Sequence, residues 1–204
     1  MRAKFLPFPL FLFLALNFSG CGVEENRGNS TTANPRWPTL PVLLRVEESL
    51  LNRGPEEEDL MAAVAFWEEK AGRKIFILGS WPTGRAAFEG SPDNPSQIID
   101  NVLSFQRPWP FELRIAGKTV LLVDKAAIQK AVIFLNAQIG LCSGLCAGQE
   151  NLTSRRRLIA HELGHFIGLN HVNDRENVMF PEILPGGSLE NLKVELPLLN
   201  ELTR

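Results

Sequence analysis

The sequence predicts an α+β domain in which a twisted mixed sheet packs against one long helix and one shorter, buried helix. Short runs rich in branched apolar residues, separated by Gly and Pro, recur along the chain, as is typical of strands. Residues 55–71 instead repeat their apolar residues at helical spacing, which predicts a helix with one apolar stripe. A second helix, predicted to begin at Thr153 or Ser154, is apolar on most of its faces and should therefore be buried.

The N-terminus has the pattern of a signal peptide. Arg2 and Lys4 precede an apolar run over residues 5–18, which is shorter than the roughly 20 apolar residues that cross a bilayer as a helix. We therefore predict a signal peptide over residues 1–20. The run ends in Ser19-Gly20-Cys21, which resembles the processing site of bacterial lipoproteins, with Cys21 as the acylated first residue. An ordinary secreted protein with an incidental cysteine is the alternative.

Acylation of Cys21 would decide where the protein is found. Two or more acyl chains hold a protein on a membrane without a spanning helix. The lipoprotein interpretation thus predicts anchoring in the cell envelope, facing outside the cytoplasm, whereas without acylation the protein would be secreted. The following residues are polar and rich in Gly, Ser, Thr, Asn and Pro, so residues 21–38 should form the lipidated cysteine and a flexible tether.

Residues 39–204 remain for a single domain with its own core, which we expect to be a monomer. Six strands are predicted in it: Leu40–Val46, Lys74–Leu78, Ile98–Phe105, Phe111–Ile115, Thr119–Val123 and Lys130–Leu135. A tight turn at Ala116-Gly117 should join the fourth and fifth. The charge is close to balanced, with 21 basic and 23 acidic residues and a net charge of -2, which argues against a nucleic-acid partner.

The long helix has clear signals at both ends. Pro55 suits the first helical position, and the acidic residues 56–59 complement the positive end of the helix dipole. Gly72 should end the helix after Lys70. Trp67 belongs to the apolar stripe, so we expect it in the core.

The most informative stretch is residues 161–171, with the pattern HExxHxxGxxH, which holds all three histidines of the chain. His161 and His165 lie four apart, so both face one side of a helix and can reach one metal ion. Gly168 can adopt the left-handed conformation that turns the chain back and brings His171 to the same ion. Three nitrogen ligands leave a fourth position for water, as in catalytic zinc sites. Glu162, beside the first ligand, is placed to take that water's proton.

With Val178-Met179-Phe180-Pro181 a few residues beyond, this segment resembles the metzincin zinc peptidases, and among them it is most similar to the matrixins. The resemblance implies a zincin-type catalytic domain that binds one zinc ion and hydrolyses peptide bonds in proteins or peptides. It also implies a role for each matching residue: His161, His165 and His171 as zinc ligands, Glu162 as general base, and Met179 as the Met-turn residue beneath the metal. It further suggests that an extended peptide binds along a sheet edge near Val132–Asn136.

Two questions stay open from the sequence. Cys142 and Cys146 lie in a Gly-rich loop, where outside the cytoplasm a local disulfide competes with two free thiols. A surface lipoprotein that uses a metzincin fold only for binding, without significant proteolysis, is the rival to a peptidase. Glu162 argues against that rival, because a pure binder needs no general base.

Overall fold

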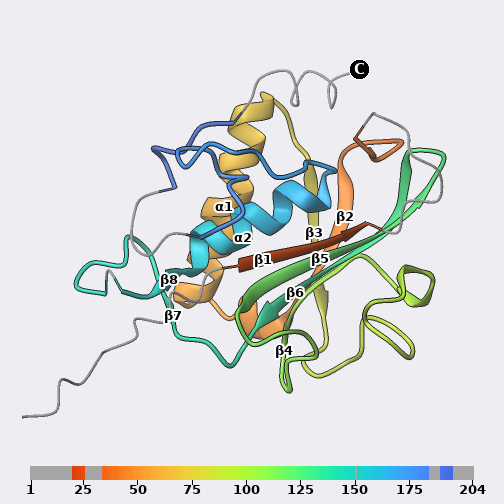
Figure 1. Ribbon diagram of the computed structural model, residues 1–204, viewed down its shortest axis with the longest axis horizontal. Helices are drawn as coiled ribbons and strands as arrows, with labels where there is room; N and C mark the ends of the chain where they lie inside the picture. Colours follow the sequence, from red (N-terminus) through yellow and green to blue (C-terminus); the bar gives the residue numbers. More distant parts are fainter. Residues whose placement is uncertain (1–19, 26–33, 150, 184–188, 195–204) are drawn as a thin grey trace, which may run out of the picture.

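The computed structural model describes residues 20–25, 34–149, 151–183 and 189–194, and these form a mixed sheet with two helices on one face (Figure 1). The sheet has the order β1-β5-β6-β4-β2-β3. All neighbouring strands are parallel except β5 and β6. The bounds are β1 Gly20–Glu25, β2 Val42–Glu47, β3 Phe76–Trp81, β4 Val102–Gln106, β5 Ile115–Asp124 and β6 Ala127–Asn136. The predicted α+β class with a mixed sheet is confirmed.

Helix α1 spans Pro55–Ala71, as the sequence predicts, with Pro55 in its first turn. Gly72 ends it in the left-handed conformation, at φ 64°, where its backbone N–H reaches the last carbonyls of the helix. Trp67 is fully buried, and its ring N–H donates to the carbonyl oxygen of Ala160 at 2.7 Å. That bond joins α1 to the second helix and fixes the distance between them.

Helix α2 spans Arg155–Phe166 and follows a short ladder of β7 (Leu141–Cys142) with β8 (Thr153–Ser154). Ser154 caps it, because its hydroxyl accepts from the backbone N–H of Arg157 at 3.3 Å. Arg155 and Arg156 each lie 3.3 Å from the carboxylate of Asp59 on α1, which is almost fully buried. These ion pairs hold the start of α2 against α1 and compensate the cationic side chains at a positive helix end.

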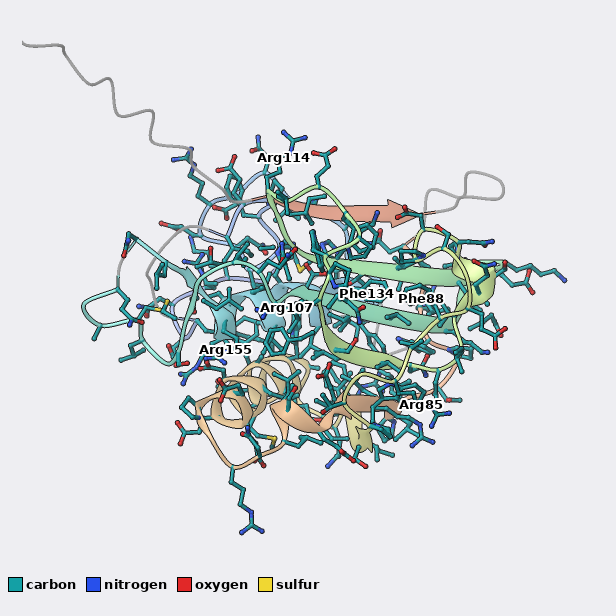
Figure 2. All side chains as sticks on the ribbon, turned by 90° about the horizontal axis from the view of Figure 1, so that it is seen from below. Arg85, Phe88, Arg107, Arg114, Phe134 and Arg155 are labelled. Atoms are coloured by element: carbon teal, nitrogen blue, oxygen red, sulfur yellow. A yellow bond between two sulfur atoms is a disulfide. The ribbon has the colours of Figure 1, made fainter. Side chains whose placement is uncertain are left out.

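The sheet buries side chains on both of its faces. The larger core lies between the sheet and the two helices. The smaller one, the aromatic cluster, lies on the opposite face, between the strands and the segments on either side of β4, and contains Trp81, Trp109, Phe134, Phe88 and Phe111. Figure 2 shows Phe88 and Phe134 next to each other over the strands, and their ring centroids are 5.4 Å apart in an edge-to-face arrangement. This face is sealed by apolar rings rather than by a helix.

The predicted turn at Ala116-Gly117 is wrong, because β5 runs unbroken from Ile115 to Asp124. The reversal into β6 comes instead at Lys125 and Ala126, which have φ values of 48° and 65°. Gly117 suggested a turn by its residue type. In this fold a glycine inside a strand marks a place where another group comes close to the backbone.

The strand expected at the sheet edge is also placed differently. Val132–Asn136 belongs to β6, which lies between β5 and β4 and so presents no open edge. The edge beyond β5 is covered by β1, whose residues Gly20–Glu25 overlap the predicted tether. Parallel pairing of this kind uses backbone groups only, so the polar composition of the segment gave no sign of it.

The rest of the predicted tether also meets the domain in part. Arg36 forms a bridge with Ala127, and the ring N–H of Trp37 donates to the carbonyl oxygen of Phe166 at 2.7 Å. The packed domain therefore includes residues before 39. Residues 1–19, the bulk of the predicted signal peptide, lie outside the described part of the chain, and Cys21 falls within β1. None of the helices in the described ranges is long and apolar enough to cross a membrane.

Candidate metal and catalytic site

The three histidines of the sequence motif converge on one point. His161 Nε2 lies 3.0 Å from His165 Nε2 and 3.2 Å from His171 Nε2, and the remaining pair is 3.1 Å apart. His161 and His165 come from successive turns of α2, whereas His171 returns from the segment that follows it. The site is thus built by one helix and one bend, as the spacing predicts.

The other ring nitrogens explain why the three imidazoles point inward. His161 Nδ1 lies 2.8 Å from the carbonyl oxygen of Val178, and His165 Nδ1 lies 2.7 Å from that of Leu169. A carbonyl oxygen can only accept, so each of these Nδ1 atoms carries the proton and each Nε2 presents a lone pair. These two carbonyl groups fix both the tautomer and the orientation of the two imidazole rings.

Burial keeps these rings neutral. Burial lowers the pKa of His161 to about 3 and the pKa of His165 well below its usual range. It also lowers the pKa of His171, which is only partly buried. The Nε2 lone pairs of His161 and His165 lie 3.0 Å apart and repel one another unless a cation lies between them. The arrangement therefore favours a bound metal ion.

The donor set fits zinc. A tetrahedral zinc ion with zinc–nitrogen distances of about 2.0–2.1 Å holds its ligand nitrogens about 3.3–3.4 Å apart. The observed separations of 3.0–3.2 Å come close to that value without any rearrangement of the fold. Among the described residues, these three histidines are the group of side chains that can reach a common metal ion.

Gly168 allows the chain to bend back after α2, and Met179 packs against the same helix. Gly168 has φ 99°, and a Cβ there would overlap the carbonyl oxygen of Pro35. Met179 is buried directly against Gly164 of α2, and its carbonyl oxygen accepts from the backbone N–H of Val172 at 3.1 Å. The Met179 turn is thereby tied to the residue that follows His171.

Glu162 is fully buried and lies against β5. Its Oε2 is 2.6 Å from the hydroxyl oxygen of Thr119. A Cβ added to Gly117 would lie 2.6 Å from Glu162 Oε1, so only glycine leaves room for the carboxylate there. Neither Thr119 nor Gly117 was identified from the sequence. The signal in the sequence is the glycine at position 117, whose residue type is also typical of a turn.

Cys142 and Cys146 form a disulfide in the structure, with an S–S distance of 1.98 Å. The loop between them is tied to the helices, because the backbone N–H of Gly144 donates to Asp59 Oδ1 at 2.9 Å. Arg155 also contacts the hydroxyl of Ser143. The disulfide loop thus supports the start of α2 and does not reach the histidines.

A mixed sheet backed by two helices, with three convergent histidines and a glutamate on the second helix, is the architecture of a metzincin catalytic domain. The sequence model of the matrixin family matches residues 79–196, which is more than half of the chain, and the chain belongs to that family. The matched range holds β5, α2 and the Met179 turn. Matrixins are zinc metallopeptidases. No curated protein matches the sequence in a search of such proteins.

Proposed function

We propose that this protein is a zinc-dependent metalloendopeptidase that cleaves peptide bonds in proteins or peptides, with His161, His165 and His171 holding one zinc ion. The observation that carries the proposal is the meeting of three neutral Nε2 atoms within 3.0–3.2 Å of one another. Zinc bound by three histidines lowers the pKa of a coordinated water to about 7 and polarises a substrate carbonyl.

The chain supplies the proton transfers through Glu162. This carboxylate is the neighbour of His161 and is not needed as a ligand, so it can take the proton of the attacking water. The same carboxylic acid can then give that proton to the nitrogen of the leaving amine. The surrounding residues of α2, which include Leu158, Leu163 and Phe166, are fully buried and limit the access of other water to the base.

The test is cleavage of a mixed peptide library by three preparations: zinc-loaded protein, chelator-treated protein, and treated protein to which zinc has been restored. We expect cleavage by the first and third and a loss of at least about 100-fold in the second, because the chemistry needs the metal. If all three preparations hold peptides without cleaving them, the protein is a binding lipoprotein with a metzincin fold, and the peptidase proposal is wrong.

We also propose that the mature protein is a monomer anchored in the cell envelope through acylated Cys21 and facing outside the cytoplasm. The charged start, the short apolar run and Ser19-Gly20-Cys21 support this. Cys21→Ala should abolish labelling by a fatty-acid probe and leave the precursor unprocessed or mislocalised. Labelling that persists in Cys21→Ala would show that the acyl chain is attached elsewhere, and a secreted protein would show no labelling of the parent.

A further inference from the structure

We propose that Thr119 on β5 is a positioning residue that holds the carboxylate of Glu162 for proton transfer. This inference rests on the proposed peptidase function. The Thr119 hydroxyl oxygen lies 2.6 Å from Glu162 Oε2 and 3.2 Å from the backbone carbonyl oxygen of the same residue. Both residues are fully buried, so bulk water does not compete for these contacts.

The hydroxyl has one proton, and the two distances indicate where it goes. A hydroxyl that donates to an ionised carboxylate typically makes a bond of about 2.5–2.7 Å, shorter and stronger than one to a neutral acceptor. The 2.6 Å contact to Glu162 Oε2 falls in that range, whereas the contact to the carbonyl is longer. With Glu162 ionised, as its proposed role as a base requires, Thr119 donates to the carboxylate.

The position of Thr119 suits a fixed support. Gly117 and Thr119 are two residues apart on β5, so they lie on the same face of the strand, toward α2. The strand is held by its antiparallel pairing with β6, in which Gly117 is opposite Leu135 and Thr119 is opposite Ile133. The carboxylate is thus held by a hydroxyl at one residue and accommodated by a missing Cβ at the other. A base fixed by a rigid strand keeps its orientation better than one fixed by a loop.

Orientation matters here because proton transfer requires a heavy-atom distance of about 2.6–3.2 Å. Three torsions separate the Glu162 carboxylate from its backbone, and the Thr119 hydroxyl is one of the contacts that restrict them. A displacement of about 1 Å at a catalytic group can cost on the order of 100-fold in rate. Thr119 would act on the rate of reaction and leave the affinity for peptide to other residues.

The decisive comparison is between Thr119→Val, which keeps the branched shape and removes the hydroxyl, and Thr119→Ser, which keeps the hydroxyl. In the zinc-loaded protein we expect Thr119→Val to lower kcat by about 10- to 100-fold, with KM changed less than about 2-fold. Zinc content should stay at the parental level in both variants. Thr119→Ser should recover kcat to within about 3-fold of the parent.

The same substitution in the Glu162→Gln background separates positioning from a general structural role. If Thr119 acts through the carboxylate, Thr119→Val should lower kcat no further in Glu162→Gln. Thr119→Val should also lower the unfolding temperature less in Glu162→Gln than in the parent, because the hydrogen bond between Thr119 and the Glu162 carboxylate is already lost there. Equal falls in unfolding temperature and equal losses of kcat in the two backgrounds would overturn the proposal.

Other outcomes also decide between the possibilities. Parental kcat in Thr119→Val would overturn the positioning role and leave the peptidase proposal intact. Loss of zinc together with activity in both Thr119→Val and Thr119→Ser would show a structural role in the metal site, which also overturns it. Failure of the proposed function looks different, since the parent itself would then cleave no peptide, and both proposals would be wrong.

Discussion

Both faces of the central sheet are buried, but the side chains that cover them differ in kind. On the α2 side, Thr119 of the sheet hydrogen-bonds to Glu162, and His161 and His165 are buried on the same helix. On the opposite face the aromatic cluster fills the space between the strands and the segments on either side of β4. Burying apolar rings stabilises a fold, whereas burying ionisable groups costs stability unless each is paired. The helix side therefore combines the larger apolar core with buried ionisable groups, whereas the opposite side is filled mainly by the aromatic cluster.

The first prediction concerns stability and the aromatic face. Phe134 is almost fully buried, with Phe88 and Phe111 at centroid distances of 5.4 and 5.6 Å. Phe134→Ala should lower the free energy of unfolding by about 3–5 kcal/mol, because it leaves a cavity that the neighbours fill only in part. The kcat of the folded fraction should change less than about 2-fold. Urea unfolding and steady-state kinetics measure the two quantities.

The control for Phe134→Ala is Leu113→Ala. Leu113 lies in the same loop region with 66% of its surface exposed, so its loss should change stability by less than about 0.5 kcal/mol. If kcat fell as much for Phe134→Ala as for a substitution on the α2 face, the claim that the aromatic face affects stability and not activity would be wrong.

The next effect concerns the approach of β5 to Glu162. Gly117→Ala places a methyl group 2.6 Å from Glu162 Oε1, so the carboxylate must move. We expect kcat to fall by about 100-fold or more, with a loss of stability of about 1–3 kcal/mol from overpacking. Gly79→Ala on β3 is the matched control. A Cβ there meets its nearest neighbour, a methyl of Leu43, at 3.4 Å, so kcat should be unchanged. Equal kcat values for the two variants would contradict this account.

A third prediction follows from the lowered pKa values of the histidines. In the unfolded chain each histidine takes up a proton near pH 6.5, whereas burial holds the pKa of His161 at about 3 in the native protein. As the pH falls below about 6.5, the unfolded state gains protons that the native state does not, so the metal-free protein loses stability. The loss should be on the order of 1 kcal/mol per pH unit for each fully buried histidine, and it should continue toward pH 3 for His161.

Urea unfolding of chelator-treated protein between about pH 7 and pH 5 measures this loss. Phe134→Ala serves as the control, because it should lower the free energy of unfolding by the same amount at every pH and leave its dependence on pH unchanged. A stability that stays flat over this interval would show that the imidazoles are protonated in the native state, and the neutral three-histidine site would then be wrong.

The parts of the structure that depend on local spacing were predictable. Helix α1 begins at Pro55 and ends before Gly72, because proline and glycine mark the two ends of a helix by local backbone geometry. The HExxHxxGxxH spacing places the three histidines around one point, because helix geometry aligns the first two and the left-handed Gly168 brings back the third. Contacts between distant segments were not predictable. Thr119 and Glu162 are 43 residues apart, and β1 pairs with β5 through backbone groups alone. No periodicity in the sequence reports such contacts, and the residue type of Gly117 is equally typical of a turn and of a close contact within a strand.

The central claim is that three histidines hold the metal while Glu162 performs the proton transfer, and one paired measurement separates these roles. Zinc content by atomic spectroscopy is determined beside the turnover of a quenched fluorescent peptide, for the parent, Glu162→Gln and His165→Ala. Glu162→Gln should keep one zinc ion per chain and lose at least about 100-fold in turnover, since general acid and base steps contribute about 100- to 10,000-fold. His165→Ala should lose both zinc and turnover. Parental turnover in Glu162→Gln would contradict the account.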